Sequence, residues 1–276
     1  MATKTLSENI NQAISDFNGI KQAIIDKGVQ VPSGTPTSQY GTKIGEIQSG
    51  GGDTLGKDMI ERKVTSLTVP SDVTTIGECA FYSWNTLASI ILHEGITSIG
   101  DYAFYYCSNL ALTELPNGIT SIGKYAFYYC SKLSIISLPA GITSIGNAAF
   151  NGCKKLALTS LPSGLTSINA SSFNGCSNLA LTSLPSGLTV INGSSFCSCT
   201  KLALTLIPSG VTSIGPYAFL SCTGLTNITF LGKPSKIDTS AFQGCTKLTS
   251  ITCPWAEGEV SGSPWGATKA TITYTG

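Results

Sequence analysis

Cysteine is the residue type that could carry most of the chemistry in this chain. The 276 residues include ten cysteines but a single histidine, His93, and a single arginine, Arg62. Thiols can form disulfides, bind zinc or act as nucleophiles. Zinc sites need Cys-x-x-Cys or Cys/His pairs, whereas the closest pair here is Cys197-x-Cys199. The sequence therefore predicts no metal and no cofactor.

Composition narrows the function classes further. The formal net charge is +1, and charged residues make up 11% of the chain against roughly 25% in an ordinary soluble domain. A neutral chain lacks the basic surface of a nucleic-acid binder or of a polybasic membrane segment. Hydrophobic residues make up 42%, which is ample material for a core. The composition favours a protein that binds neither nucleic acid nor membranes.

The elements that position these residues follow a 23-residue repeat. Isoleucine stands five residues before each of eight phenylalanines, leucine stands six residues after each, and cysteine stands three residues after seven of them. These phenylalanines, which number repeats 1 to 8, are Phe81, Phe104, Phe127, Phe150, Phe173, Phe196, Phe219 and Phe242. A fixed period of this length predicts a solenoid in which equivalent residues of successive repeats form columns.

Each repeat predicts a short circuit of local structures. Leu133–Leu138 has the β-branched and apolar content of a strand, and Ile142–Ile145 is a second extended piece. Between them, Pro139-Ala-Gly141 predicts a type I turn with proline at its second position. Gly, Asn or Asp stands four residues before each phenylalanine, so we expect Ala-Phe-x-x-Cys to form one helical turn. Stacking places a parallel sheet on one face and helical turns on the other.

Seven of the cysteines occupy one repeat position. Neighbours in this column would lie about one strand spacing (~4.8 Å) apart, which is near the Cα separation of a disulfide. Small apolar side chains in a column also fill a solenoid core, and free cysteine is among the most buried residue types. We therefore expect buried free thiols at Cys107, Cys130, Cys153, Cys176, Cys199, Cys222 and Cys245.

The repeat resembles a known family. The pattern Leu-x-x-Ile-x-Leu-Pro-x-x-Ile-x-x-Ile-Gly-x-x-Ala-Phe-x-x-Cys is similar to the leucine-rich repeat of bacterial BspA-type surface proteins over roughly residues 61–254. The resemblance implies a right-handed leucine-rich repeat solenoid with a parallel concave sheet and a role in adhesion and recognition. Members usually carry a signal peptide, and the first ten residues here lack the apolar run of one.

The sequence outside the repeats predicts three further regions: a helical segment at 1–49, a Gly-rich linker at 50–58 and a C-terminal cap at 255–276, around a solenoid at 59–254. Apolar residues of the first segment follow a heptad spacing that predicts oligomerisation, with docking of this helix on the first repeat as the alternative. They are Leu6, Ile10, Ala13, Phe17, Ile20 and Ile24. In the cap, Trp255 and Trp265 are expected to cover the last layer, and Thr271–Tyr274 to pair as an edge strand.

Both ends also resemble phage proteins. Phe17–Ile47 is similar to N-terminal segments of phage and prophage tail-associated proteins from gut Firmicutes, and Pro254–Thr268 is similar to their C-terminal tails. This resemblance implies a virion protein that is released by lysis and is cytoplasmic before it. The alternative location is the bacterial cell surface.

Two groups of residues are candidate binding surfaces. An apolar residue stands eight positions after the phenylalanine in five repeats and predicts an outward ribbon: Leu112, Ile135, Leu158, Leu181 and Leu204. The alternative is a local shift of register that buries these residues and exposes the adjacent threonines. Six tyrosines gather in repeats 2 and 3 and suit contact with a protein or glycan, with simple packing as the alternative: Tyr102, Tyr105, Tyr106, Tyr125, Tyr128 and Tyr129.

The sequence as a whole predicts a non-enzymatic recognition protein. Its most specific form is a phage or prophage tail-associated receptor-binding protein, which would bind a protein or glycan on a cell surface and tail proteins or further copies through its N-terminal helix. A BspA-like adhesin is the alternative. A glycan-active enzyme is disfavoured because it needs two carboxylates about 5–9 Å apart, and Glu94, Asp101 and Glu114 occupy three different repeat positions.

Overall fold

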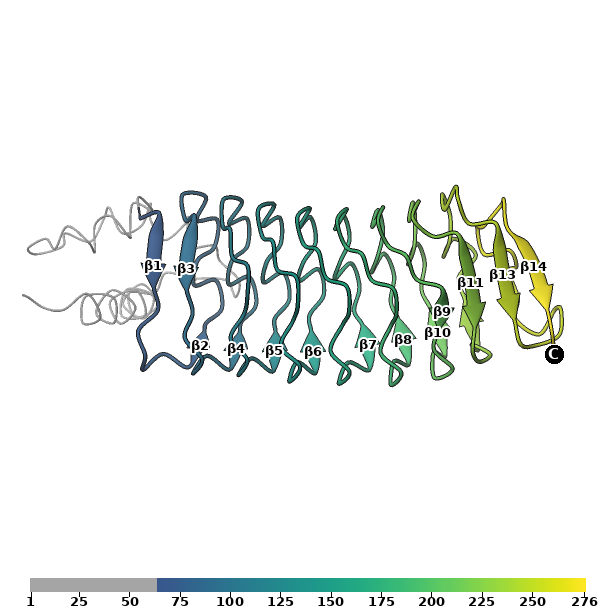
Figure 1. Ribbon diagram of the computed structural model, residues 1–276, viewed down its shortest axis with the longest axis horizontal. Helices are drawn as coiled ribbons and strands as arrows, with labels where there is room; N and C mark the ends of the chain where they lie inside the picture. The colour runs from purple at the N-terminus through teal and green to yellow at the C-terminus, as the bar shows by residue number, and fades with distance from the viewer. Residues whose placement is uncertain (1–63) are drawn as a thin grey trace, which may run out of the picture.

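The computed structural model describes residues 64–276, which form a stack of parallel coils (Figure 1). The expected N-terminal helix and linker, with the heptad residues Leu6, Ile10, Ala13, Phe17, Ile20 and Ile24, lie outside the described residues. The strands are β1 (Ser66–Thr68), β2 (Thr75–Ile76), β3 (Ser89–Ile91), β4 (Ser98–Ile99), β5 (Ser121–Ile122), β6 (Ser144–Ile145), β7 (Ser167–Ile168), β8 (Val190–Ile191), β9 (Leu206–Ile207), β10 (Ser213–Ile214), β11 (Asn227–Phe230), β12 (Lys236–Ile237), β13 (Ser250–Cys253) and β14 (Thr271–Tyr274).

The strands form two columns, and all their pairings are parallel. The second-strand column follows the Pro-x-Gly turns and contains the sheets β2-β4-β5-β6 and β7-β8-β10-β12. It runs along one edge of the molecule in Figure 1. The first-strand column contains β1-β3 at one end and β9-β11-β13-β14 at the other. Residues 23 apart are in register, as in Ile99 beside Ile122, because each coil repeats the same circuit.

Repeats 2 to 5 depart from the predicted first strand. The segment Leu133–Leu138 was expected to be a strand, and the structure has no strand there. Its backbone still bonds the coils on both sides, since Ser134 N donates to Leu112 O of the preceding coil at 3.0 Å and Ala157 N of the following coil donates to Ile135 O at 3.1 Å. The side chain that points inward is the one two residues after the leucine of the repeat motif. In repeats 1, 7 and 8, the inward residue is the next one: Ile90, Ile228 and Ile251.

The expected helical turn is also absent: residues 64–276 contain no helix. A helix requires each N–H to bond within its own segment at φ near −63°. Here alternate N–H groups bond across coils, as when Phe104 N donates to Ala126 O at 2.7 Å. The groups between them close short turns, as when Tyr105 N donates to Tyr102 O at 3.1 Å. Tyr102 has a φ of 56°, which breaks any helical run.

The Pro-x-Gly segments form β-turns in which proline holds the first position. Ile142 N donates to Pro139 O at 3.2 Å, and Ile119 N donates to Pro116 O at 3.2 Å. The sequence prediction placed proline one position later. The turn of repeat 1 begins at His93 instead, whose Nδ1 accepts a hydrogen bond from Gly95 N at 3.1 Å.

The core consists of the predicted columns. The phenylalanine rings stack on one another with centroids 5.1–5.7 Å apart and interplanar angles of 4–12°. The leucines six residues after them are fully buried from Leu87 to Leu248, and the isoleucines from Ile76 to Ile237 are buried beside them. Because each column continues through the stack, every repeat covers the apolar residues of its neighbours.

The C-terminal end of the stack is closed by aromatic residues. Trp255 and Trp265 are buried and contact Phe230 edge-on at 5.2 Å and 6.2 Å between centroids. β14 pairs with β13, which is the edge-strand pairing expected from the sequence. The last turns of the solenoid are thereby shielded from water.

Candidate functional site

The tyrosines of repeats 1 to 3 form one continuous cluster, which we call the tyrosine block. It comprises Tyr82, Tyr102, Tyr105, Tyr106, Tyr125, Tyr128 and Tyr129. Six of these were singled out from the sequence, and Tyr82 was missed. It occupies the repeat position of Tyr105 and Tyr128, so the 23-residue period could have found it.

The rings of the tyrosine block stack in three columns. Tyr82, Tyr105 and Tyr128 stack with centroids 4.7 Å and 4.9 Å apart, and Tyr102 stacks on Tyr125 at 5.0 Å. Tyr106 stacks on Tyr129 at 5.1 Å. Edge-on contacts join the columns to one another. The tyrosines therefore pack against one another, as the alternative interpretation expected in part. Their mutual packing makes the surface rigid.

The tyrosine block remains accessible at its outer side. Tyr106 and Tyr129 are 39% and 40% exposed, and the other members are half-buried. Burial, followed by the neighbouring phenol of Tyr82, raises the pKa of Tyr105 to about 12, and burial likewise raises the pKa of Tyr102 and Tyr128. These phenols therefore stay protonated at neutral pH and can both donate and accept hydrogen bonds.

Small residues end the tyrosine block at repeat 4. Gly152 occupies the position of Tyr106 and Tyr129 and has a φ of 74°. A Cβ added there would lie 3.0 Å from the ring of Tyr129. The last ring of this column therefore packs directly over glycine backbone, which fixes its orientation.

The predicted apolar ribbon does not lie on the surface. Ile135, Leu158, Leu181 and Leu204 are buried and Leu112 is half-buried, so the register-shift alternative describes repeats 2 to 6. The adjacent threonines are exposed instead: Thr113, Thr159, Thr182 and Thr205. Burying leucine rather than threonine is favourable because leucine carries more apolar area and no polar group. Ile136, which follows Ile135 in repeat 3, is likewise exposed, at 67%.

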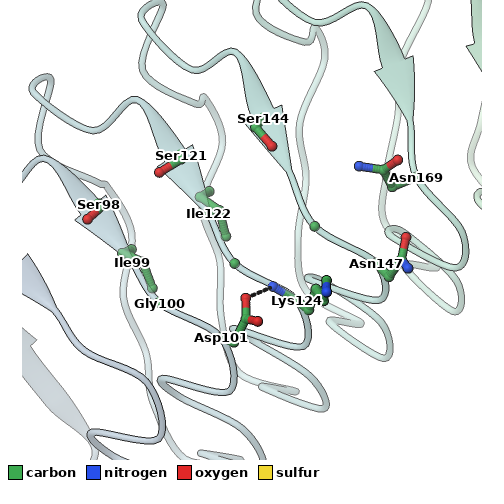
Figure 2. Close-up of a pocket in the computed structure, with 12 residues that line it drawn as sticks. Ser98, Ile99, Gly100, Asp101, Ser121, Ile122, Lys124, Ser144, Asn147 and Asn169 are labelled. Atoms are coloured by element: carbon green, nitrogen blue, oxygen red, sulfur yellow. Dashed lines mark hydrogen bonds between the residues drawn. The ribbon is translucent and has the colours of Figure 1, made fainter.

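A polar groove lies beside the tyrosine block, over β4, β5 and β6 (Figure 2). Its volume is about 560 Å³, which is within the usual range for ligand sites. Equivalent residues of successive repeats line it: the strand serines Ser98, Ser121 and Ser144, and the turn residues Asp101, Lys124 and Asn147. These residues were not predicted from the sequence to form a binding site, because polar side chains are ordinary on the surface of a repeat protein; Asp101 was considered only as a catalytic carboxylate.

The cysteine column is buried, and its thiols form hydrogen bonds within the core. The thiol of Cys130 donates to Phe104 O at 3.0 Å, and equivalent bonds link the other members to the phenylalanine 26 residues earlier. Burial raises the pKa of the Cys130, Cys153, Cys199 and Cys222 thiols well above the usual value. A buried thiol that stays protonated is a poor nucleophile.

No metal centre is found among residues 64–276. They contain no group of three His, Cys, Asp or Glu side chains placed to hold an ion. They also contain no helix long and apolar enough to span a membrane. The tyrosine block and the groove offer aromatic contact and hydrogen-bonding groups.

Comparison with known sequences agrees with this repeat geometry. The BspA type leucine rich repeat region matches residues 60–180 and 143–261. The chain belongs to the BspA-type leucine-rich repeat family. Leucine-rich repeat proteins are generally non-enzymatic and bind other proteins or surfaces, and BspA-type members are typically cell-surface proteins. No curated protein matches the chain.

Two solved structures resemble this BspA-type solenoid. A leucine-rich repeat protein from Bacteroides ovatus is 32% identical with a TM-score of 0.66, over 77% of this chain and 56% of that protein. A leucine rich cell surface protein from Faecalibacterium prausnitzii is 26% identical with a TM-score of 0.58, over 68% of this chain and 63% of that protein. The chain thus spans less than two thirds of either relative.

Proposed function

We propose that this protein is a non-enzymatic recognition protein that binds a partner on a cell surface through the tyrosine block. The observation that carries the proposal is the stacking of seven tyrosines into one rigid, accessible surface. Tyrosine is enriched at the centres of binding interfaces. Its ring gives contact area at a low cost in conformational entropy, and mutual stacking lowers that cost further.

The family and the fold support a cell-surface setting. The F. prausnitzii protein that this chain resembles is described as a leucine rich cell surface protein. In this setting the solenoid is an adhesin that presents the tyrosine block to a protein or glycan of another cell. The repeat family gives this version of the proposal its main support.

A tail-associated receptor-binding protein is the second candidate. The observation in its favour is the resemblance of Phe17–Ile47 and Pro254–Thr268 to segments of phage tail-associated proteins, together with the heptad spacing from Leu6 to Ile24. In that setting the N-terminal segment attaches the protein to a tail, and the tyrosine block contacts the host surface. Both settings share the same recognition surface.

The test compares two tyrosines in the block with one outside it. Serine fits the backbone at Tyr106 and Tyr129, because Ser198 and Ser221 adopt the same positive φ at this repeat position. Fluorescently labelled Tyr106→Ser/Tyr129→Ser protein should lose at least tenfold in affinity for gut bacterial or epithelial cells that bind the unaltered protein. Tyr217, 45% exposed in repeat 7, supplies the control. Equal binding by the double variant and by Tyr217→Ser would refute the role of the block.

A further inference from the structure

We propose that the polar groove over β4, β5 and β6 binds an extended, uncharged glycan laid along the solenoid axis, with about one sugar unit per repeat. This inference rests on the proposed recognition function and names the chemical class of its ligand. The groove is separate from the stacked rings, and its lining comes from strands and from the turns that follow them (Figure 2).

The strand serines form a regular row of hydroxyl groups. Ser98, Ser121 and Ser144 are paired partners in one parallel sheet. Neighbouring strands in such a sheet lie about 4.8 Å apart, which is close to the length of one pyranose unit in an extended glycan. Each hydroxyl offers one donor and two acceptors. The row can therefore bond sugar hydroxyls on successive units in a constant register.

These serine hydroxyls differ from the neighbouring threonine column. Thr97 Oγ1 donates to Thr74 O at 3.1 Å and Thr120 Oγ1 donates to Thr97 O at 3.3 Å, so these two threonine hydroxyls already bond the coil before them. Among the hydrogen bonds of residues 64–276, none engages the side chains of Ser98, Ser121 or Ser144. Their donors and acceptors are available to a ligand.

The turn residues beside the serines vary in charge. One repeat position holds Asp101, Lys124 and Asn147 in succession, so the wall carries one negative, one positive and one neutral polar group. Asp101 Oδ1 accepts a hydrogen bond from Lys124 N at 2.7 Å, which fixes the carboxylate (Figure 2). An alternating wall gives no net attraction to a polyanion such as nucleic acid. It suits an uncharged ligand with many hydroxyls.

The groove has a defined end. The sheet that contains β4, β5 and β6 stops at β6, and β7 begins the next sheet. At this break Asn169 Nδ2 donates to Ile145 O at 2.7 Å, and Asn169 forms the last part of the lining. The bound segment is therefore about three to four sugar units long.

The groove and the tyrosine block are adjacent along the chain. Asp101 immediately precedes Tyr102, and Lys124 immediately precedes Tyr125. Within a column of the tyrosine block the ring faces stack on one another, as Tyr102 does on Tyr125. A protein that carries a glycan bound in the groove would therefore lie near the tyrosine block.

The experiment uses the full chain and an array of uncharged oligosaccharides of three to six units: cello-, xylo-, manno- and N-acetylchito-oligosaccharides. Sulfated and uronic-acid polymers are included as charged probes. The positive probe is then measured by calorimetric titration. Ser121→Val/Ser144→Val removes two groove hydroxyls, and valine fits because Val190 occupies this position in repeat 6. Ser213→Val is the control at the same position outside the groove. We expect the groove variant to lose at least tenfold in affinity and the control to be unchanged.

Three outcomes would overturn the glycan site: no array glycan bound, equal affinities for the groove variant and the control, or binding only to sulfated or uronic-acid polymers. The two proposals also fail separately. If Tyr106→Ser/Tyr129→Ser loses cell binding while the groove variant binds cells normally and no oligosaccharide binds, the glycan inference fails and the tyrosine proposal stands. If oligosaccharides bind through the serines but the tyrosine variant binds cells normally, the tyrosine proposal fails and the glycan inference stands.

Discussion

The thiol of Cys153 donates a hydrogen bond to the carbonyl oxygen of Phe127, 26 residues earlier, at 3.0 Å. The bond joins two successive coils inside the core, where both groups are shielded from water. It gives the thiol a structural role in place of a chemical one. The same bond recurs along the column, so each coil is fastened to the one before it by sulfur as well as by its backbone.

The thiols should be unreactive in the folded protein. Alkylating reagent at neutral pH is expected to modify at most Cys197, the half-buried member of the ten, within the time that free cysteine reacts completely. After denaturation without a reducing agent, titration should find close to ten thiols. Finding two or fewer would mean that the chain forms disulfides.

Stability should fall at alkaline pH. Burial raises the pKa of the Cys245 thiol from 9.0 to about 12, and burial with Tyr82 raises the pKa of Tyr105 from 10.0 to about 12. A group whose pKa is higher in the folded than in the unfolded protein contributes its full stabilisation at pH values below the unfolded pKa. This contribution is lost as the pH rises through the pKa of the folded protein. The melting temperature should be constant up to about pH 9 and should fall between about pH 9 and pH 12. A level curve to pH 12 would contradict these shifts.

Replacing Ser172 with alanine should stabilise the protein. Its hydroxyl is fully buried without a hydrogen-bond partner, and alanine fills the same column at Ala126 and Ala149. An unsatisfied buried hydroxyl costs about 1–3 kcal/mol, so urea unfolding of Ser172→Ala should show a gain of about 1 kcal/mol. Ser195→Ala is the matched control and should lose stability, because Ser195 Oγ donates to Asn192 O at 2.7 Å. Destabilisation by Ser172→Ala would show that its hydroxyl has a partner.

Gly123 should not tolerate alanine. An added Cβ would lie 2.5 Å from Asp101 N, a backbone atom that cannot move aside alone. Urea unfolding of Gly123→Ala should show a loss of about 1–3 kcal/mol. At Gly187 nothing lies within 4 Å of the added Cβ, so Gly187→Ala should leave the free energy of unfolding unchanged or raise it by a few tenths of a kcal/mol. Equal effects at the two glycines would mean that the coils are spaced more widely.

The N-terminal segment should mediate association. We expect the full chain to self-associate through residues 5–27, because an isolated helix of this length is marginal in water unless its apolar face is covered. A chain beginning at Asp53 should be a folded monomer by light scattering and circular dichroism. Two monomeric samples, with the shorter one less stable, would favour the capping alternative instead.

The columns of the core could be predicted from the sequence because a fixed period places equivalent residues in equivalent surroundings. Phe150 and Leu156 needed no other information, since a stack of identical circuits buries both. The choice between Ile135 and Ile136 could not be made locally, because both are apolar and adjacent. The next repeat has Leu158 and Thr159 at these two positions. Because neighbouring coils are in register, burial of Leu158 also buries Ile135 and exposes Ile136.

The local turn and the groove were harder to predict for different reasons. Gly100, four residues before Phe104, is of a residue type that is favoured at helix starts. The backbone nevertheless forms hydrogen bonds to the neighbouring coil, and these replace the bonds of a helix. The groove depends on which side chains remain unbonded after the coils stack. Thr97 and Ser98 are adjacent hydroxyl residues in the sequence, and only the structure shows that the first donates to the neighbouring coil.

The same hydrogen bonds determine how the molecule would respond to tension. Within residues 64–276 each coil is bonded to its neighbours in the stack, so a force applied along the stack loads these contacts in series and detaches coils from one end. Each detached coil would release 23 residues, as set by the spacing of Phe127 and Phe150, or roughly 80 Å of extended chain. A solenoid of this kind lengthens in equal steps and dissipates work at each one. In the adhesin setting proposed above, this response would keep an attached cell in place under flow.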